Sequence, residues 1–387
     1  MLTPYDEFPV HQASRPFSHL PSTDHAWDDG YFFGVYSAEA KLFLFTGMRV
    51  NANADVIGGY AGVIIDGRQY TTRLSRVWRP EFETSIGPLA YRFVEPMKAI
   101  HISLQPAASE LSFDLDWRAL APPHEEEHHL VVNRGRITTD QTRYTQSGTA
   151  LGSITFRRVT YEVSPTRWSA SRDHSWGLYR ARYPLSAHAK WLPPPEAPAV
   201  RRALRFWMPF QTPGYSGFYQ FHEDEEGRQL EMDDIFGTAF EGAVGYGFDS
   251  PPIRFKSAQH RLSFFPGTRS VSGGVVNLID EQERTWRHEL SVDSPPWLSS
   301  TIGYNAGSWK DGGSISTYHG PGVYTEADEF DFSKQPIELN DYLGSPLKAY
   351  GNEHLVTLRS IGPGGEVKGL AHLEFLCEGR YRPYGFE

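Results

Sequence analysis

Apolar and polar residues alternate along this chain in short runs. Residues 99–104 and 111–117 alternate with a period of two, which is the pattern of a strand with one buried face. Few stretches show the apolar i, i+3, i+4, i+7 spacing of an amphipathic helix over three turns. Further runs typical of strands occupy residues 31–36, 41–45, 217–222, 262–265, 354–358 and 369–375. The pattern therefore predicts an all-β protein.

Turn residues stand between these runs at hairpin spacing. Asp66-Gly67 separates residues 62–65 from 68–74, and this dipeptide favours a tight two-residue hairpin turn. Gly362-Pro363-Gly364-Gly365 is typical of another hairpin turn. Antiparallel hairpins throughout a chain favour sandwiches or barrels, because closure removes exposed strand edges.

A proline-rich segment lies near the midpoint of the chain. Residues 191–198 contain four prolines, which a sheet or helix interior does not accept. A length of 387 residues suits two domains better than one. We predict two β domains, residues 1–188 and 189–387, although a long loop inside one domain would also explain the prolines.

Composition narrows the class of protein. Aromatic residues reach 14%, enough to bury a large area with few aliphatic side chains. The net charge of −10 and the lack of a basic block argue against nucleic acid as a partner. A single cysteine, Cys377, excludes an intrachain disulfide and favours a cytoplasmic protein. Neither a signal peptide nor a membrane span is apparent.

Most motif matches have a simpler structural interpretation. His124-Glu125-Glu126-Glu127-His128 matches the zinc-protease string, but that chemistry needs both histidines on one helix face. Two prolines precede the string and a strand-like run follows it, so we interpret it as a loop. Nucleotide-binding and serine-hydrolase motifs are missing. We interpret Cys377 as a core residue, and we expect His372 and Glu374 to lie on a solvated strand face.

Residues 169–180 gather ionisable and aromatic side chains. Arg172-Asp173-His174-Ser175-Trp176-Gly177 places an aspartate beside a histidine, a pairing that fixes an imidazole tautomer or raises its pKa. In a strand, His174 and Trp176 would project from one face and Asp173 from the other. The segment is either a functional site or a strand end held by an Arg–Asp pair and a buried tryptophan.

The Asp-His-Ser-Trp-Gly string resembles a motif of the carotenoid 1,2-hydratase (hydroxyneurosporene synthase) and AttH-like group, which includes kievitone hydratase-like proteins and lipocalin-type Diels–Alderases. The resemblance implies two consecutive lipocalin-like antiparallel β-barrels or sandwiches, with the motif at the end of the first. It also implies that His174 and Trp176 take part in adding water to a double bond. The group's Tyr-x-Asp element is not reproduced, since Asp233 stands near the expected tyrosine.

We therefore predict a hydratase, dehydratase or isomerase that acts on a hydrophobic small molecule, isoprenoid, steroid-like or aromatic, without a cofactor or metal. His174 and Asp173 would be the acid–base pair, Asp233 a further acid, and Trp176 a pocket wall. Arg172 and Arg180 would orient the aspartate or a polar end of the substrate. Other candidate substrate-binding residues are Tyr31, Tyr219, Tyr304, Trp309, Tyr318 and His319.

Two other functions fit the same sequence. A carrier of lipids or pigments would need only an apolar lining, and a pericyclic catalyst would need Trp176 but no acid. An enzyme of the predicted kind needs Asp173, His174 and an acid from the second half of the chain within hydrogen-bond reach. The sequence leaves a homodimer open.

Overall fold

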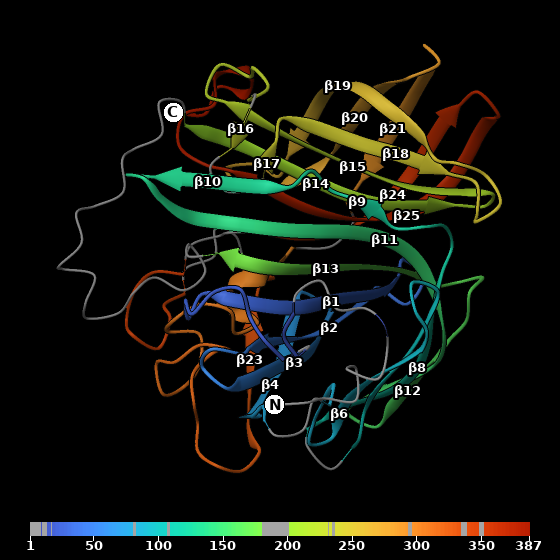
Figure 1. The fold of residues 1–387 in the computed structure, drawn as a ribbon. Helices are drawn as coiled ribbons and strands as arrows, with labels where there is room; N and C mark the ends of the chain where they lie inside the picture. Colours follow the sequence, from blue (N-terminus) through green and yellow to red (C-terminus); the bar gives the residue numbers. More distant parts are fainter. Residues whose placement is uncertain are drawn as a thin grey trace.

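The computed structural model describes residues 9, 14–16, 18–79, 83–106, 109–179, 201–230, 232–233, 237–292, 296–333, 339–347 and 352–387. Over these ranges the chain forms β-strands and two short 3-10 turns, with no α-helix, as Figure 1 shows. The all-β prediction is confirmed. No helix within these ranges is long and apolar enough to cross a membrane.

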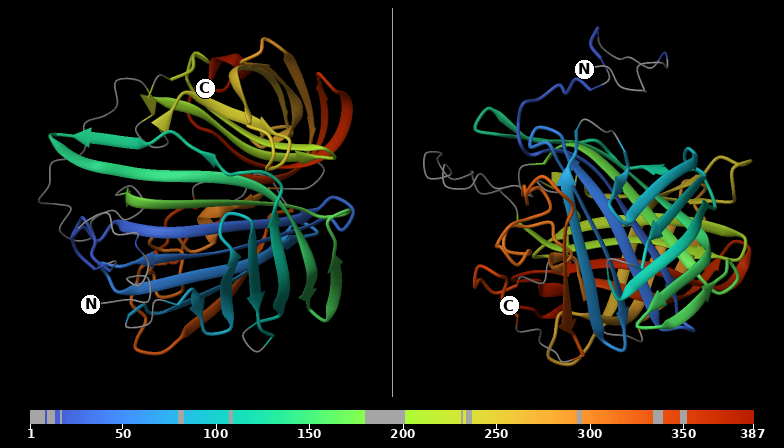
Figure 2. Two further views of the ribbon diagram at one scale, coloured as in Figure 1. Left: turned by 45° about the vertical axis from the view of Figure 1, so that its right-hand side comes forward. Right: turned by 90° about the horizontal axis from the view of Figure 1, so that it is seen from below.

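The first sheet is an open, curved half-barrel of 14 strands (Figure 2). Its main path runs β23 (Tyr324–Asp331), β4 (Arg68–Val77), β3 (Val56–Ile65), β2 (Leu42–Asn51), β1 (Trp27–Ser37), β13 (Ser169–Tyr179), β11 (Arg136–Phe156), β8 (Leu111–Ala119), β7 (Ala99–Leu104), β6 (Leu89–Glu95) and β5 (Ser85–Ile86). The short strands β9 (His124–Glu125), β10 (His129–Asn133) and β12 (Val159–Val163) pair with β11.

The second sheet closes into a barrel. Its path runs β21 (Thr285–Ser291), β20 (Val271–Asp280), β19 (Ile253–Phe264), β18 (Phe240–Gly245), β15 (Tyr215–Asp224), β14 (Arg202–Thr212), β25 (Gly365–Cys377), β24 (Asn352–Gly362) and β22 (Trp297–Leu298). Pairing of β21 with β24 closes the ring, so no strand edge is left open there. The strands β16 (Met232–Asp233) and β17 (Gly237–Thr238) form a separate pair.

The expected turns are present. Asp66 and Gly67 connect β3 to β4 with positive φ angles of 50° and 74°, as a two-residue hairpin of this type requires. Gly362 and Gly365 close the β24–β25 hairpin. The expected domain boundary, between residues 188 and 189, falls outside the described residues and stays a prediction. One strand joins the two halves of the sequence, because β23 pairs with β4.

Strand alternation gives the half-barrel two buried faces. The concave face holds an apolar core that includes Phe33, Leu115 and Trp117. The opposite face, which we call the inter-barrel face, packs against the outside of the second barrel, with β11 next to β14 and β15 (Figure 1). Glycines on this face make room for large side chains: a Cβ at Gly47 would lie 2.3 Å from the Tyr60 hydroxyl.

Candidate functional site

His174 lies near the middle of the half-barrel, on β13 between β1 and β11. The strand registers pair it with Tyr31 on one side and with Tyr144 on the other. Residues paired across neighbouring strands share a sheet face. The three rings therefore form one row across three strands on the concave side of the sheet.

The His174 imidazole has a partner at each nitrogen. Nε2 lies 2.7 Å from Asp29 Oδ1, and Nδ1 lies 3.2 Å from the Tyr144 hydroxyl. The Tyr31 ring stacks on the imidazole at 4.0 Å, and the Trp176 ring lies 4.9 Å away. The side chain of His174 is 15% exposed and that of Asp29 is 53% exposed. The cluster is thus open to solvent on the Asp29 side.

These contacts define the proton positions. A carboxylate only accepts, so Nε2 carries the hydrogen donated to Asp29, and whenever the ring is neutral Nδ1 accepts a hydrogen bond. Burial raises the pKa of Tyr144, which keeps its hydroxyl protonated as the donor to Nδ1. Asp29, His174 and Tyr144 therefore form a continuous hydrogen-bonded chain. We call it the Asp29–His174–Tyr144 relay.

Arg172 lies beneath this relay. Its Nε and Nη2 donate to Gln146 Oε1 at 2.9 and 2.7 Å. Its Cζ lies 4.9 Å from the Trp117 ring centroid and 5.1 Å from that of Tyr144. Burial lowers the pKa of Arg172. Arg172 therefore packs against the ring of Tyr144. The sequence suggested instead that Arg172 orients Asp173 or a polar end of the substrate.

Asp173 lies on the inter-barrel face, away from His174. Its row across the sheet contains Phe32 and Gly47, and its charge raises the pKa of Tyr60 and of Glu353. Alternation along the strand separates Asp173 from His174, as expected. The sequence suggested Asp173 as the partner of His174, but the carboxylate bonded to the imidazole is that of Asp29.

The remaining predicted site residues do not gather at His174. Tyr219 is buried inside the second barrel, and its hydroxyl lies 3.3 Å from His288 Nδ1. The Tyr304 hydroxyl lies 2.6 Å from that of Tyr60 on the inter-barrel side. Trp309 is buried and stacks on His319 at 4.5 Å. Tyr318 is 58% exposed.

Two predicted residues are placed only in part or not at all. Asp233 lies on β16, the short strand paired with β17, and its side chain is outside the described residues. Arg180 follows the last described residue of β13 and is outside them entirely. Their predicted roles stay predictions.

Acidic and basic side chains fill part of the inter-barrel face. His372 is buried, with Nε2 2.7 Å from Glu353 Oε2. Arg205 Nε donates to Glu374 Oε1 at 2.8 Å. The expectation of a solvated face is wrong for His372, because the half-barrel packs over the outside of β25 there, whereas the side chain of Glu374 is 25% exposed. A single strand shows the periodicity of such a face but not which surface covers it.

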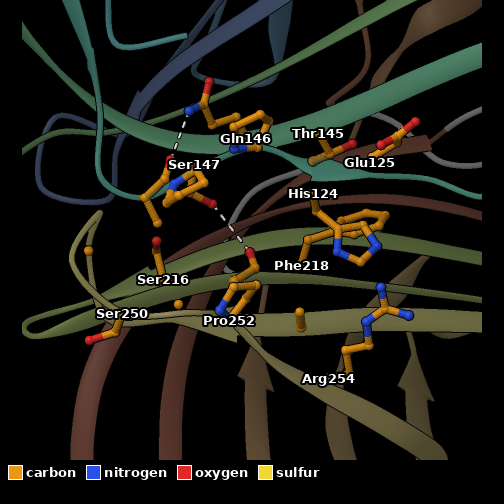
Figure 3. A pocket seen from close by; sticks show the side chains of 17 residues that line it. His124, Glu125, Thr145, Gln146, Ser147, Ser216, Phe218, Ser250, Pro252 and Arg254 are labelled. Carbon is orange, nitrogen blue, oxygen red and sulfur yellow. Dashed lines mark hydrogen bonds between the residues drawn. The ribbon is translucent and has the colours of Figure 1, made fainter.

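A crevice of about 190 Å³ opens where the two barrels meet. Figure 3 shows His124, Phe218 and Arg254 on its walls, together with Gln146. His124 Nε2 lies 3.3 Å from Glu241 Oε2. Gln146 also donates to the Ala121 carbonyl at 2.7 Å, so the side chain that holds Arg172 lines this crevice.

The described residues contain no group of three or more His, Cys, Asp or Glu side chains placed to hold a metal ion. His124 begins a short strand and His128 lies 2.9 Å from Asp140. The expected strand follows at His129, but the expected loop is only partly present, because His124 and Glu125 form a strand paired with β11 and Glu126 is buried. Cys377 is buried in the second core, as expected, and burial raises the pKa of its thiol to about 11.

Comparison with known proteins gives a family and a set of structures. A family model described as a family of unknown function (DUF8625) matches residues 2–387. No curated protein matches the chain in sequence.

Three of the structures found are proteins of the group that the Asp-His-Ser-Trp-Gly string resembles. An AttH-type protein (NE1406) from Nitrosomonas europaea has a TM-score of 0.49 at 11% identity, over 91% of this chain and 93% of that chain. Kievitone hydratase from Nectria haematococca has a TM-score of 0.41 at 10% identity, over 90% and 89%. CghA has 0.46 at 7% identity, over 91% and 88%. Likeness at this level transfers no residue role or activity to this chain.

Proposed function

The chain belongs to the DUF8625 family of unknown function, and from its own side chains we propose that it is a cofactor-independent hydratase, dehydratase or isomerase. The substrate would be a hydrophobic small molecule with a polarised double bond or the corresponding alcohol. His174 would be the acid–base group.

The observation that carries this proposal is the Asp29–His174–Tyr144 relay. A general base needs a fixed tautomer, a partner that stabilises its charged form and reach to the proton it takes. Asp29 Oδ1, 2.7 Å from Nε2, fixes the tautomer and stabilises the charged imidazole. The Tyr144 hydroxyl extends the reach of Nδ1 toward the substrate. The same three groups can return the proton, so one site serves addition and elimination of water.

The steps balance without any further reagent. In the hydration of an unsaturated ketone, a water oxygen bonds to the β-carbon and loses its proton to the Tyr144 oxygen. Tyr144 passes its own proton to His174 Nδ1, and Asp29 stabilises the imidazolium. Reversal of the relay then delivers that proton to the α-carbon of the enolate. Dehydration is the reverse sequence. In an isomerisation no water adds: the relay takes a proton from the α-carbon of a β,γ-unsaturated ketone and returns it to the γ-carbon of the dienolate.

The surroundings of the relay favour an apolar substrate. Tyr31 and Trp176 flank the imidazole, and Phe93 lies 5.2 Å from Tyr31. Aromatic faces bind apolar skeletons, and they stabilise developing positive charge by about 0.5–2 kcal/mol each. We therefore propose that these aromatic side chains bind the apolar part of the substrate while the Asp29–His174–Tyr144 relay moves the proton.

The test uses a panel of unsaturated ketones and their hydrates in ¹⁸O-labelled water, with label incorporation followed by mass spectrometry. We expect H174A to lower the rate by about 10²–10⁴-fold, the usual contribution of a positioned acid–base group. H128A is the matched control, because His128 also has a carboxylate partner, Asp140, at 2.9 Å. Turnover by H174A at the rate of H128A would contradict the proposal. Binding of the ketones without any turnover would identify a carrier instead.

A further inference from the structure

A second hydrogen-bonded chain crosses from the closed barrel to β13. Glu353 on β24 lies 2.7 Å from His372 Nε2 on β25, through its Oε2. His372 Nδ1 lies 3.2 Å from Ser171 Oγ on β13. All three side chains are buried. Ser171 is three residues before His174 on the same strand, so this chain ends close to the relay but on the opposite face of the sheet.

Aromatic rings enclose His372. The ring centroids of Phe43, Phe32 and Trp207 lie 4.8, 5.4 and 5.4 Å from that of the imidazole, and that of Trp297 lies 6.2 Å away. An ion pair in such surroundings would lose most of its hydration, at a cost that its own attraction does not reliably recover. A neutral acid bonded to a neutral imidazole avoids that cost.

The neighbouring charges also favour the neutral pair. Glu353 lies directly opposite Glu374 across β24 and β25. Burial alone would raise the pKa of Glu374, but Arg205 overcomes this effect and lowers it, so Glu374 is the ionised member of the two. Burial, Glu374 and Asp173 together raise the pKa of Glu353 well above its usual range, against the opposing effect of Arg205.

The imidazole is neutral for a related reason. Burial lowers the pKa of His372 to about 3, with Glu374 acting in the other direction and the nearby His354 in the same one. Glu353 then donates its proton to Nε2, and the Nδ1 hydrogen is donated to Ser171 Oγ. The neighbouring carboxyls of Glu353 and Glu374 have their pKa values shifted in opposite directions, so the proton stays on Glu353.

We propose that Glu353 and His372 are positioning residues, which as a neutral acid–imidazole pair tie the closed barrel to β13 at Ser171 and thereby set the place of His174 between Asp29 and Tyr144. The functional part of this inference depends on the role proposed above for His174, whereas the structural part does not. It assigns to the second barrel a direct effect on a relay built wholly from the half-barrel.

The test compares E353Q with E353A. A glutamine amide keeps a hydrogen donor for Nε2 and mimics a protonated glutamate, whereas alanine removes the donor. Imidazole ¹⁵N resonances of His174 and the midpoint of urea unfolding are measured for both, with E366Q on the exposed end of β25 as the control. At pH 5, where little of the stabilisation by protonated Glu353 has been lost, we expect E353Q to leave both readouts at their wild-type values and E353A to shift both. Infrared difference spectra should show a carboxylic acid band that E353Q abolishes.

Two results would overturn the inference. If E353Q shifts both readouts as far as E353A does, the pair is ionic and not neutral. If E353A leaves the His174 resonances in place, the chain has no positioning effect. S171A removes the acceptor of the His372 Nδ1 hydrogen together with the Ser171–Tyr36 hydrogen bond, and it provides a second test should E353A fail to fold. An unmoved His174 resonance in S171A contradicts the inference.

Activity gives a separate readout. With the substrate found in the panel above, we expect E353A and S171A to lower kcat with little change in KM, and E353Q to retain kcat. The resonances report on positioning without turnover. If H174A does not affect the reaction, the proposed function is wrong, but the His174 resonances still test the positioning effect.

Discussion

The proposed chemistry depends on three side chains from three different strands. Asp29 on β1 and Tyr144 on β11 hold the imidazole of His174 on β13 at 2.7 and 3.2 Å. The histidine and its tryptophan neighbour were predictable from a local string, because strand alternation places His174 and Trp176 on one face. Asp29 and Tyr144 were not, since their distances depend on strand pairings over 145 and 30 residues.

Replacing Asp29 by Asn keeps the size of the partner but removes its charge. The amide cannot stabilise an imidazolium and can present an N–H to Nε2, which favours the other tautomer. We expect D29N to lower kcat by about 10²–10⁴-fold, with ¹⁵N spectra showing a changed His174 tautomer. D140N, at the corresponding partner of His128, should leave the rate unchanged. A wild-type rate in D29N would remove Asp29 from the mechanism.

Strand β23 shows what pairing between distant segments adds to the fold. Its register with β4 places Glu326 opposite Arg73, with Nη1 of Arg73 2.8 Å from Glu326 Oε1. Arg73 Nη2 also donates to the Thr301 carbonyl at 2.8 Å. Hairpins such as β3–β4 were predictable because their turn residues are adjacent in sequence. The β23–β4 pairing was not, because no local signal in either strand identifies a partner some 250 residues away.

Arg73 and Arg68 give a matched pair of substitutions on β4. Arg73 is fully buried, so R73A would leave Glu326 buried without its cation, and we expect a loss of about 3–5 kcal/mol in the free energy of unfolding. Arg68 pairs with Glu329 and Asp331 at the surface, and R68A should lose about 0–1 kcal/mol. Urea unfolding of both variants measures this difference. Equal losses would show that the buried pair does not hold β23 in place.

The two barrels together bury ionisable groups whose protons respond to folding. The imidazoles of His288, His354 and His372 all have their pKa lowered to about 3 by burial, whereas the pKa of Glu353 is raised. Below the ordinary histidine pKa of 6.5, the unfolded chain binds more protons on these histidines than the folded chain does. Stability is therefore lost as the pH falls from about 6.5.

Glu353 acts in the opposite direction. Above its ordinary pKa of 4.5 the unfolded chain releases a proton that the folded chain keeps. Its contribution is thus fully present below that pH and is lost as the pH rises toward the folded pKa, by about 1.4 kcal/mol per pH unit. We expect the stability of the wild type to fall relative to that of E353Q as the pH rises above about 4.5. Urea unfolding from pH 5 to 9 measures the difference, and parallel curves would contradict a protonated Glu353.

The all-β class and its hairpins follow from periodicity and turn residues, and both are confirmed. The surface that covers each sheet face does not follow from them. Asp173 and His174 are neighbours in sequence, yet they face the inter-barrel layer and the concave core, respectively. His372, expected on a solvated face, is enclosed because another sheet packs there. Periodicity within one strand defines its two faces, and only tertiary packing decides what each face meets.

Turnover of H174A, D29N, Y144F and the triple variant on one substrate tests the relay most directly. Groups that act as one unit lose their effect together, so we expect H174A to be nearly as slow as the triple variant and the three single losses to be far from additive. Wild-type turnover by H174A, or three independent and additive losses, would show that Asp29, His174 and Tyr144 do not form a catalytic relay.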